Sequence, residues 1–162
     1  MITQSELKIL FSYDLDTGLF TRLVTVKNSK AGTVINKKDT KGYIYFAINK
    51  KMYLGHRLAW FYVNGVMPVA QIDHINGLKD DNRFINLREC NNSQNNTNIG
   101  IRADNTSGFK NVSFSKKSNN WVVIIRINGK KTYLGGFKDI EFADLVATEA
   151  RNKYHGEFAR HS

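Results

Sequence analysis

Alternating apolar and polar positions predict two short strands in the middle of the chain. They span residues 71–75 and 87–90, and the turn-forming pair Asn76-Gly77 ends the first of them. An Asn-rich stretch from Ser93 onward is expected to form a short helix directly after the second strand. The middle of the chain is therefore predicted to be a strand–strand–helix unit.

The pattern changes after residue 106. Residues 109–114, 121–127 and 131–137 are predicted strands, and Asn128-Gly129 between the last two is a strong signal for a tight hairpin turn. Residues 140–154 place apolar side chains at helical spacing. The stripe consists of Ala143, Val146, Ala147, Ala150 and Tyr154. We expect a three-stranded antiparallel sheet that is covered by this helix.

The first 55 residues predict small β hairpins. One hairpin turns at Asp16-Thr17-Gly18, and another, formed by residues 43–48 and 52–54, turns at Asn49-Lys50. The helix that follows, at residues 56–63, is expected to pack behind the strand–strand–helix unit, with His56 at its start rather than on a metal.

The chain as a whole is expected to have an α+β fold. The composition shift in the Asn-rich and Gly-containing segment favours two modules in the 162 residues. The expected organisation is a first domain at 1–98, a linker at 99–106 and a second domain at 107–162.

The segment Asp73-His74-Ile75-Asn76-Gly77 carries candidate chemistry. A neutral imidazole accepts a proton near pH 7, so His74 is the candidate general base for hydrolysis. Successive side chains of a strand point to opposite faces, so Asp73 and His74 can serve a metal and a water separately. The pattern therefore indicates hydrolysis by an activated water.

Two amides extend this set. A magnesium-class cation prefers hard oxygen ligands, which makes the Asp73 carboxylate and the Asn95 amide oxygen candidate ligands for Mg²⁺ or Mn²⁺. The amide of Asn86 both donates and accepts, which suits it to fasten the polar loop at 78–85. A base, an orienting amide and two oxygen ligands are what cutting a phosphodiester with one divalent metal requires.

This set of residues resembles the HNH nucleases, especially the phage-encoded homing endonucleases of that class. The separations of thirteen residues from Asp73 to Asn86 and twenty-two from Asp73 to Asn95 look like theirs, and the likeness covers roughly residues 40–98. It implies His74 as general base, Asp73 and Asn95 as metal ligands, and Asn86 as the residue that holds the loop and positions the base.

Three alternatives stay open at this stage. Asn82, which the pattern favours as a loop residue, is the other candidate for the central amide. A regulator that keeps the HNH scaffold without catalysis would bind DNA and leave it intact. An RNA-binding module would share the charge and the aromatic residues, but no stacking-platform motif is present. Metal-dependent cleavage, and competition between duplex DNA and RNA, separate these alternatives.

The charge of the chain favours a nucleic-acid partner. Its 24 Lys and Arg against 14 Asp and Glu give a formal net charge of +10, which attracts polyanions such as double-stranded DNA. It has no long apolar run, no N-terminal secretion pattern and one cysteine, Cys90. We expect a monomer in the cytoplasm, of a bacterial host if phage-encoded, without membrane association or a Cys-based zinc site.

Basic residues are concentrated on the sheet of the second expected domain. Residues 107–138 contain seven Lys or Arg and no acid, whereas residues 139–149 on the predicted helix contain four acids. This separation predicts that the sheet faces DNA, where Arg and Lys can pair with guanine in the major groove.

Most of residues 107–160 resembles the ethylene-response-factor type of DNA-binding domain. The likeness is carried by motifs such as Tyr133-Leu134-Gly135-Gly136-Phe137 and His155-Gly156-Glu157-Phe158-Ala159. The residues that fall where that family's sheet contacts DNA are Lys110, Ser113, Arg126, Lys131 and Tyr133. The chain departs from the plant pattern at Asn111, Ser113 and Ile124, so its preferred DNA sequence must differ.

Overall fold

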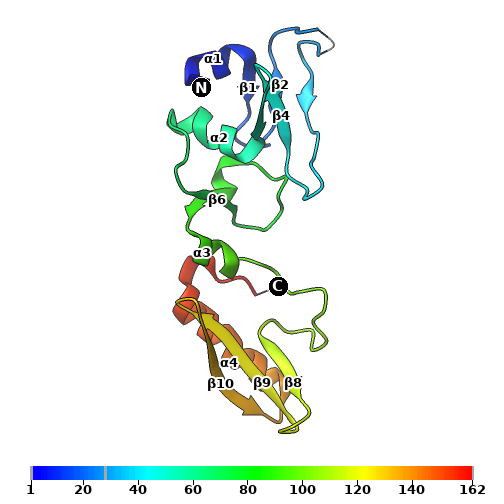
Figure 1. Cartoon of the computed structure of the whole chain (residues 1–162), viewed down its shortest axis with the longest axis vertical. Coiled ribbons are helices and arrows are strands. Elements are labelled where there is room, and N and C mark those ends of the chain that lie inside the picture. Colours follow the sequence, from blue (N-terminus) through cyan, green and yellow to red (C-terminus); the bar gives the residue numbers. More distant parts are fainter. Residues whose placement is uncertain (1, 28, 162) are drawn as a thin grey trace. The chain divides into compact units, whose positions relative to one another are not determined.

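The computed structural model describes residues 2–27 and 29–161, which form an α+β protein as expected (Figure 1). The chain divides into two compact units, Met1–Cys90 and Asn91–Ser162. None of the helices in the described ranges combines the length and the apolar character needed to cross a membrane.

The first unit consists of small antiparallel sheets, two α-helices and a short 3₁₀ helix (Figure 1). Strands β1, β2 and β3 form one sheet, while β4 pairs with β5 and β6 pairs with β7. The elements in chain order are α1 (Gln4–Leu10), β1 (Phe11–Tyr13), β2 (Phe20–Arg22), β3 (Val34–Ile35), β4 (Tyr45–Ile48), β5 (Lys51–Leu54), α2 (Gly55–Asn64), β6 (Gln71–His74), the 3₁₀ helix η1 (Phe84–Asn86) and β7 (Leu87–Cys90).

Helix α1 is an element that the hydrophobic pattern does not predict. It begins with a capping box, in which Thr3 Oγ1 accepts from the Glu6 amide at 3.1 Å and Glu6 Oε2 accepts from the Thr3 amide at 2.7 Å. Its Leu7 is fully buried. The Thr-x-x-Glu spacing is the signal in the sequence that identifies this helix.

Aromatic side chains form the core of the first unit. Phe46 on β4 packs between Phe11 and Phe20, with ring centroids 4.9 and 5.3 Å apart. Leu58 of α2 and Ile72 of β6 belong to the same buried cluster. Burial of this apolar surface fixes the β6–β7 hairpin to the rest of the unit, because the strands are too short to be stable alone.

The second unit contains a three-stranded antiparallel sheet in the order β10-β9-β8, packed on one long helix. This part of the expected fold is confirmed. Its elements are α3 (Asn92–Thr97), β8 (Val112–Ser115), β9 (Asn120–Ile127), β10 (Lys130–Phe137), α4 (Ile140–His155) and the 3₁₀ helix η2 (Gly156–Phe158).

Two details of this unit differ from the prediction. The first strand begins at Val112 rather than at residue 109, because Asn111 has a φ of +69° and Ser107 Oγ donates to the Val112 carbonyl at 2.7 Å, which forms a turn. In α4, Tyr154 is 47% exposed, whereas Arg151 is buried. The Arg151 guanidinium donates to the Lys110 carbonyl at 2.7 Å, so it satisfies a backbone oxygen that periodicity alone cannot locate.

The boundary between the units also lies earlier than expected. Helix α3 belongs with the C-terminal unit, whereas the sequence places it in the first domain. One reason is Lys110, whose ammonium donates to the carbonyls of Thr97 at 3.0 Å and Arg160 at 2.8 Å. Residues 99–106, expected to be a linker, fall within the second compact unit.

Candidate active site

The β6–β7 hairpin holds Asp73 and His74 next to each other in a buried position. Its register pairs Asp73 with Arg88 and His74 with Leu87. Asp73 is 6% exposed and His74 is 4% exposed. Consecutive strand residues present their side chains to opposite faces, so the carboxylate and the imidazole diverge as predicted from the strand.

The Asp73 carboxylate is bound by a guanidinium across the hairpin. Arg88 donates to Asp73 Oδ2 through Nε at 2.9 Å and through Nη2 at 2.8 Å. Both side chains are largely removed from water, which makes the pair stronger than a surface ion pair and costly to break from one side. Any cation held by Asp73 must share this carboxylate with Arg88.

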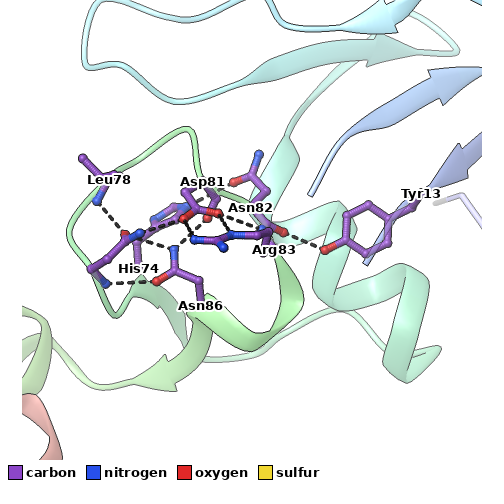
Figure 2. A network of polar contacts seen from close by, with 8 residues as sticks. Tyr13, His74, Leu78, Asp81, Asn82, Arg83 and Asn86 are labelled. Atoms are coloured by element: carbon purple, nitrogen blue, oxygen red, sulfur yellow. Dashed lines mark hydrogen bonds and ion pairs between the residues drawn. The ribbon is translucent and has the colours of Figure 1, made fainter. Parts of the chain in front are cut away.

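His74 lies against an amide side chain from the loop that joins the two strands (Figure 2). Its Nε2 is 3.1 Å from Asn82 Oδ1. Burial lowers the pKa of His74 below its ordinary value, although the Asn82 contact and nearby carboxylates, including that of Asp73, act in the opposite direction. The imidazole is therefore neutral at pH 7 and keeps one nitrogen able to accept a proton.

The side chain of Asn86 fastens the loop. Its Oδ1 accepts from the Asn76 amide at 3.0 Å, and its Nδ2 donates to Asn76 Oδ1 at 3.0 Å and to the Asp81 carbonyl at 2.8 Å (Figure 2). These bonds connect the first residues of the loop to its end. An amide at position 86 can donate and accept at the same time, which a carboxylate or a hydroxyl of similar size does less well.

Asp81 makes further hydrogen bonds within the same loop. Its carboxylate accepts from Asn76 Nδ2 at 2.7 Å and from Arg83 Nε at 2.8 Å. The hydrogen bonds from Arg83 lower the pKa of Asp81 to about 2. The carboxylate is therefore ionised across the neutral range.

A small aromatic cluster packs under His74. The ring of His56, at the start of α2, lies 5.1 Å from the His74 ring and 5.2 Å from the Tyr43 ring. Burial lowers the pKa of His56 to about 3, so this ring is neutral. His56 accordingly occupies the packing position that the sequence favours for it.

Asn95, the second predicted metal ligand, lies in α3 of the C-terminal unit. The helix begins with a capping box between Asn91 and Gln94, in which Asn91 Oδ1 accepts from the Gln94 amide at 2.9 Å. The Asn95 amide donates to the Asn91 carbonyl at 3.0 Å. Its place in the first turn of the helix agrees with the secondary structure predicted for this stretch.

Four of the five predicted DNA contacts share one face of the C-terminal sheet. The register pairs Lys131 with Arg126, Tyr133 with Ile124, and Ser113 with Val122. That face is exposed and lies opposite the buried Val123 and Ile125, which pack toward α4. The exposed residues of the set are Ser113, Arg126, Lys131 and Tyr133.

Lys110 does not share this exposed face, because its ammonium is bonded to two carbonyls inside the unit. Its expected contact with DNA stays a prediction. A groove of about 1020 Å³ is lined by Ser113, Arg126 and Lys131 together with residues 99–102. Residues of the expected linker thus stand beside the basic sheet face.

The sequence favours Asn86 over Asn82 as the amide that positions the base, and it does not predict the ion pair between Asp73 and Arg88. The structure places Asn82 Oδ1 at His74 Nε2. Asp73 and Arg88 lie equally far from the hairpin turn, so they are cross-strand neighbours once the register is known. This spacing is the feature of the sequence that could have indicated their ion pair.

Comparisons with known proteins concern the same segment. Residues 53–97, which include Asp73, His74, Asn86 and Asn95, match a family model described as HNH endonuclease. Over 108 residues the chain is 32% identical to Protein 3.8 of Escherichia phage T7, in an alignment that spans 65% of this chain and 87% of that protein. No solved structure matches the chain significantly.

Proposed function

We propose that this chain, which belongs to the same family as Protein 3.8 of Escherichia phage T7 and contains an HNH endonuclease domain, is a metal-dependent DNA endonuclease. The observation that carries the proposal is the buried, neutral His74 beside Asp73 on a hairpin inside the matched segment. The net charge of +10 supports DNA as the substrate.

His74 is the general base of the proposed reaction. Its neutral ring takes a proton from the attacking water, the water oxygen bonds to phosphorus, and the bond from phosphorus to the 3′ oxygen breaks. The departing 3′ oxygen takes a proton from a second water molecule, so the products are a 5′ phosphate and a 3′ hydroxyl.

Asp73 and Asn95 are the proposed ligands of one divalent cation, Mg²⁺ or Mn²⁺. When bound, that cation supplies charge neutralisation at the phosphate and at the departing oxygen. A carboxylate and an amide carbonyl are hard donors that suit these ions. Within the described ranges no three His, Cys, Asp or Glu side chains gather as a metal site, so the proposed donor set relies on water and phosphate for its remaining positions.

The C-terminal sheet is proposed to choose the DNA site. Arg126 and Lys131 are cross-strand neighbours on its exposed face, with Tyr133 further along the same face. A basic, exposed strand pair fits the width of the major groove, where such side chains bond base edges. Together with the likeness to the ethylene-response-factor type of domain, this supports a mobile, phage-type homing endonuclease with a preferred site.

The test is cleavage of supercoiled plasmid DNA with Mg²⁺ and with a chelator. We expect cutting that needs the metal and that is lost in Asp73→Asn and in Asn95→Ala. Asn96→Ala, an exposed neighbour in the same helix, is the matched control and should cut normally. Tight DNA binding without cutting under any divalent metal would instead identify a non-catalytic regulator.

A further inference from the structure

We infer that Asn82, rather than Asn86, is the positioning residue of the base, and that it holds His74 in the tautomer with hydrogen on Nε2. The two side chains meet at 3.1 Å between Nε2 and Oδ1. Asn82 is 1% exposed, so water does not compete for this contact. The catalytic meaning of the inference rests on the proposed function, whereas the tautomer itself does not.

The chemistry of the two groups fixes the direction of the hydrogen bond. An amide oxygen only accepts, so the imidazole nitrogen that faces it must carry the hydrogen. In a neutral ring the lone pair then belongs to Nδ1. Asn82 thereby selects Nδ1 of His74 as the atom that takes the proton.

The N-terminal β1–β2 hairpin fixes the position of the Asn82 backbone. The hydroxyl of Tyr13, at the end of β1, donates to the Asn82 carbonyl at 2.6 Å (Figure 2). Gly18 lies so close that a Cβ there would be 2.5 Å from the Asn82 carbonyl carbon, and its φ is +71°. No other residue fits this approach without displacing Asn82.

Helix α2 leaves room for the amide on its other side. A Cβ at Gly55 would lie 2.8 Å from Asn82 Nδ2, and that nitrogen is buried without a hydrogen-bond partner among the described residues. An unpaired buried donor costs about 1–3 kcal/mol. This orientation of the amide therefore costs stability at Nδ2, and the absence of a side chain at Gly55 leaves the amide the room it needs.

Asn86 has a different task. Its side chain bonds the amide and the side chain of Asn76 and the carbonyl of Asp81, all within the loop. Asn86 therefore stabilises the loop, and Asn82 orients the imidazole ring of His74.

The direct test is long-range ¹H–¹⁵N NMR of the metal-free full chain with ¹⁵N-labelled histidine. The His74 signals are assigned by their loss in His74→Ala. We expect hydrogen on Nε2 in the wild type and a mixture of tautomers in Asn82→Leu. Hydrogen on Nδ1 of His74 in the wild type would overturn the inference, even if Asn82→Leu does not fold.

Kinetics supply the second readout, on supercoiled plasmid DNA with Mg²⁺. Asn82→Leu should lower kcat by roughly 10- to 100-fold with little change in KM, the size of effect typical of partners that orient functional histidines. Asn82→Asp keeps an oxygen acceptor and should restore most of kcat. Equal kcat values for Asn82→Leu and the wild type would contradict the positioning role.

The two proposals fail separately. If His74→Ala cuts DNA as fast as the wild type, the proposed base is wrong, while the tautomer measurement still decides the role of Asn82. Thermal melting of each variant shows whether the fold is retained. Tyr13→Phe removes only the hydrogen bond to the Asn82 carbonyl. It should therefore lower kcat less than Asn82→Leu does.

Discussion

Arg88 binds the carboxylate of Asp73 through two nitrogens from the neighbouring strand, at 2.9 and 2.8 Å. The guanidinium neutralises a buried carboxylate at the position where the proposed function requires a divalent cation. A divalent cation bound at Asp73, as proposed, would share the carboxylate with Arg88.

Removing Arg88 should make the stability of the protein depend on divalent metal. Arg88→Met removes the guanidinium that neutralises the buried Asp73 carboxylate, and breaking a buried ion pair from one side typically costs about 3–5 kcal/mol. We expect Mg²⁺ to recover part of this loss, measured by urea unfolding with and without the ion. Lys38→Met is the control, because the Lys38 pair with Asp80 is exposed and such pairs contribute about 0–1 kcal/mol. A loss unaffected by Mg²⁺ would argue against metal binding at Asp73.

Removing the amide of Asn86 should loosen the loop between β6 and β7. Asn86→Ala deletes hydrogen bonds to Asn76 and to the Asp81 carbonyl, at a cost of roughly 2–4 kcal/mol when buried partners are left unpaired. Hydrogen exchange of the Asn76 amide should become faster. Asn64→Ala, which loses an exposed bond to the Trp60 carbonyl, should change stability little. Unchanged exchange at Asn76 would mean that other contacts hold the loop.

His56 should make the protein sensitive to acid. Burial lowers the pKa of His56 from 6.5 to about 3, so between these values the unfolded chain binds a proton that the folded chain does not. The stabilising contribution is complete above pH 6.5 and is lost as the pH falls toward 3, by up to about 1.4 kcal/mol per pH unit.

His56→Phe keeps a ring against Tyr43 and His74 and removes this titration. Urea unfolding between about pH 7 and about pH 4.5 should show a smaller loss of stability in the variant. Part of the loss remains, because burial also lowers the pKa of His74. Identical slopes in the two proteins would show that the His56 site titrates normally.

Two basic residues of the C-terminal unit should have different roles. Arg126, on the exposed sheet face, is expected to read DNA, so Arg126→Ala should weaken discrimination between sites by roughly 1–3 kcal/mol. Selection from a randomised duplex pool measures this. Lys110→Met should instead lower stability, because the Lys110 ammonium holds the carbonyls of Thr97 and Arg160. If Arg126→Ala keeps the wild-type site preference, Arg126 does not contact the bases that determine the site.

Local patterns in the sequence predict most of the elements but not their long-range contacts. Alternation and turn residues locate the β6–β7 hairpin, and Asn128-Gly129 locates the turn between β9 and β10, because these signals act over a few residues. The position of Asn82 beside His74 depends on Tyr13 and Gly18, which are more than sixty residues away in the chain. No local pattern contains that information.

The same limit explains the domain boundary. Composition favours a linker at 99–106, since the segment is polar and contains glycine. Lys110 and Arg151 nevertheless tie the neighbouring chain to the C-terminal unit through backbone carbonyls. Such bonds depend on where a carbonyl points, which is set by tertiary structure rather than by residue type.

The most direct measurement compares His74→Ala with the wild type in plasmid cleavage and in a DNA-binding shift assay, both with Mg²⁺. Removal of a general base typically lowers the rate about 10²- to 10⁴-fold, and the variant should bind DNA as tightly as the wild type. Cleavage by His74→Ala at the wild-type rate, or a wild type that binds DNA without cutting it in any divalent metal, would contradict the account.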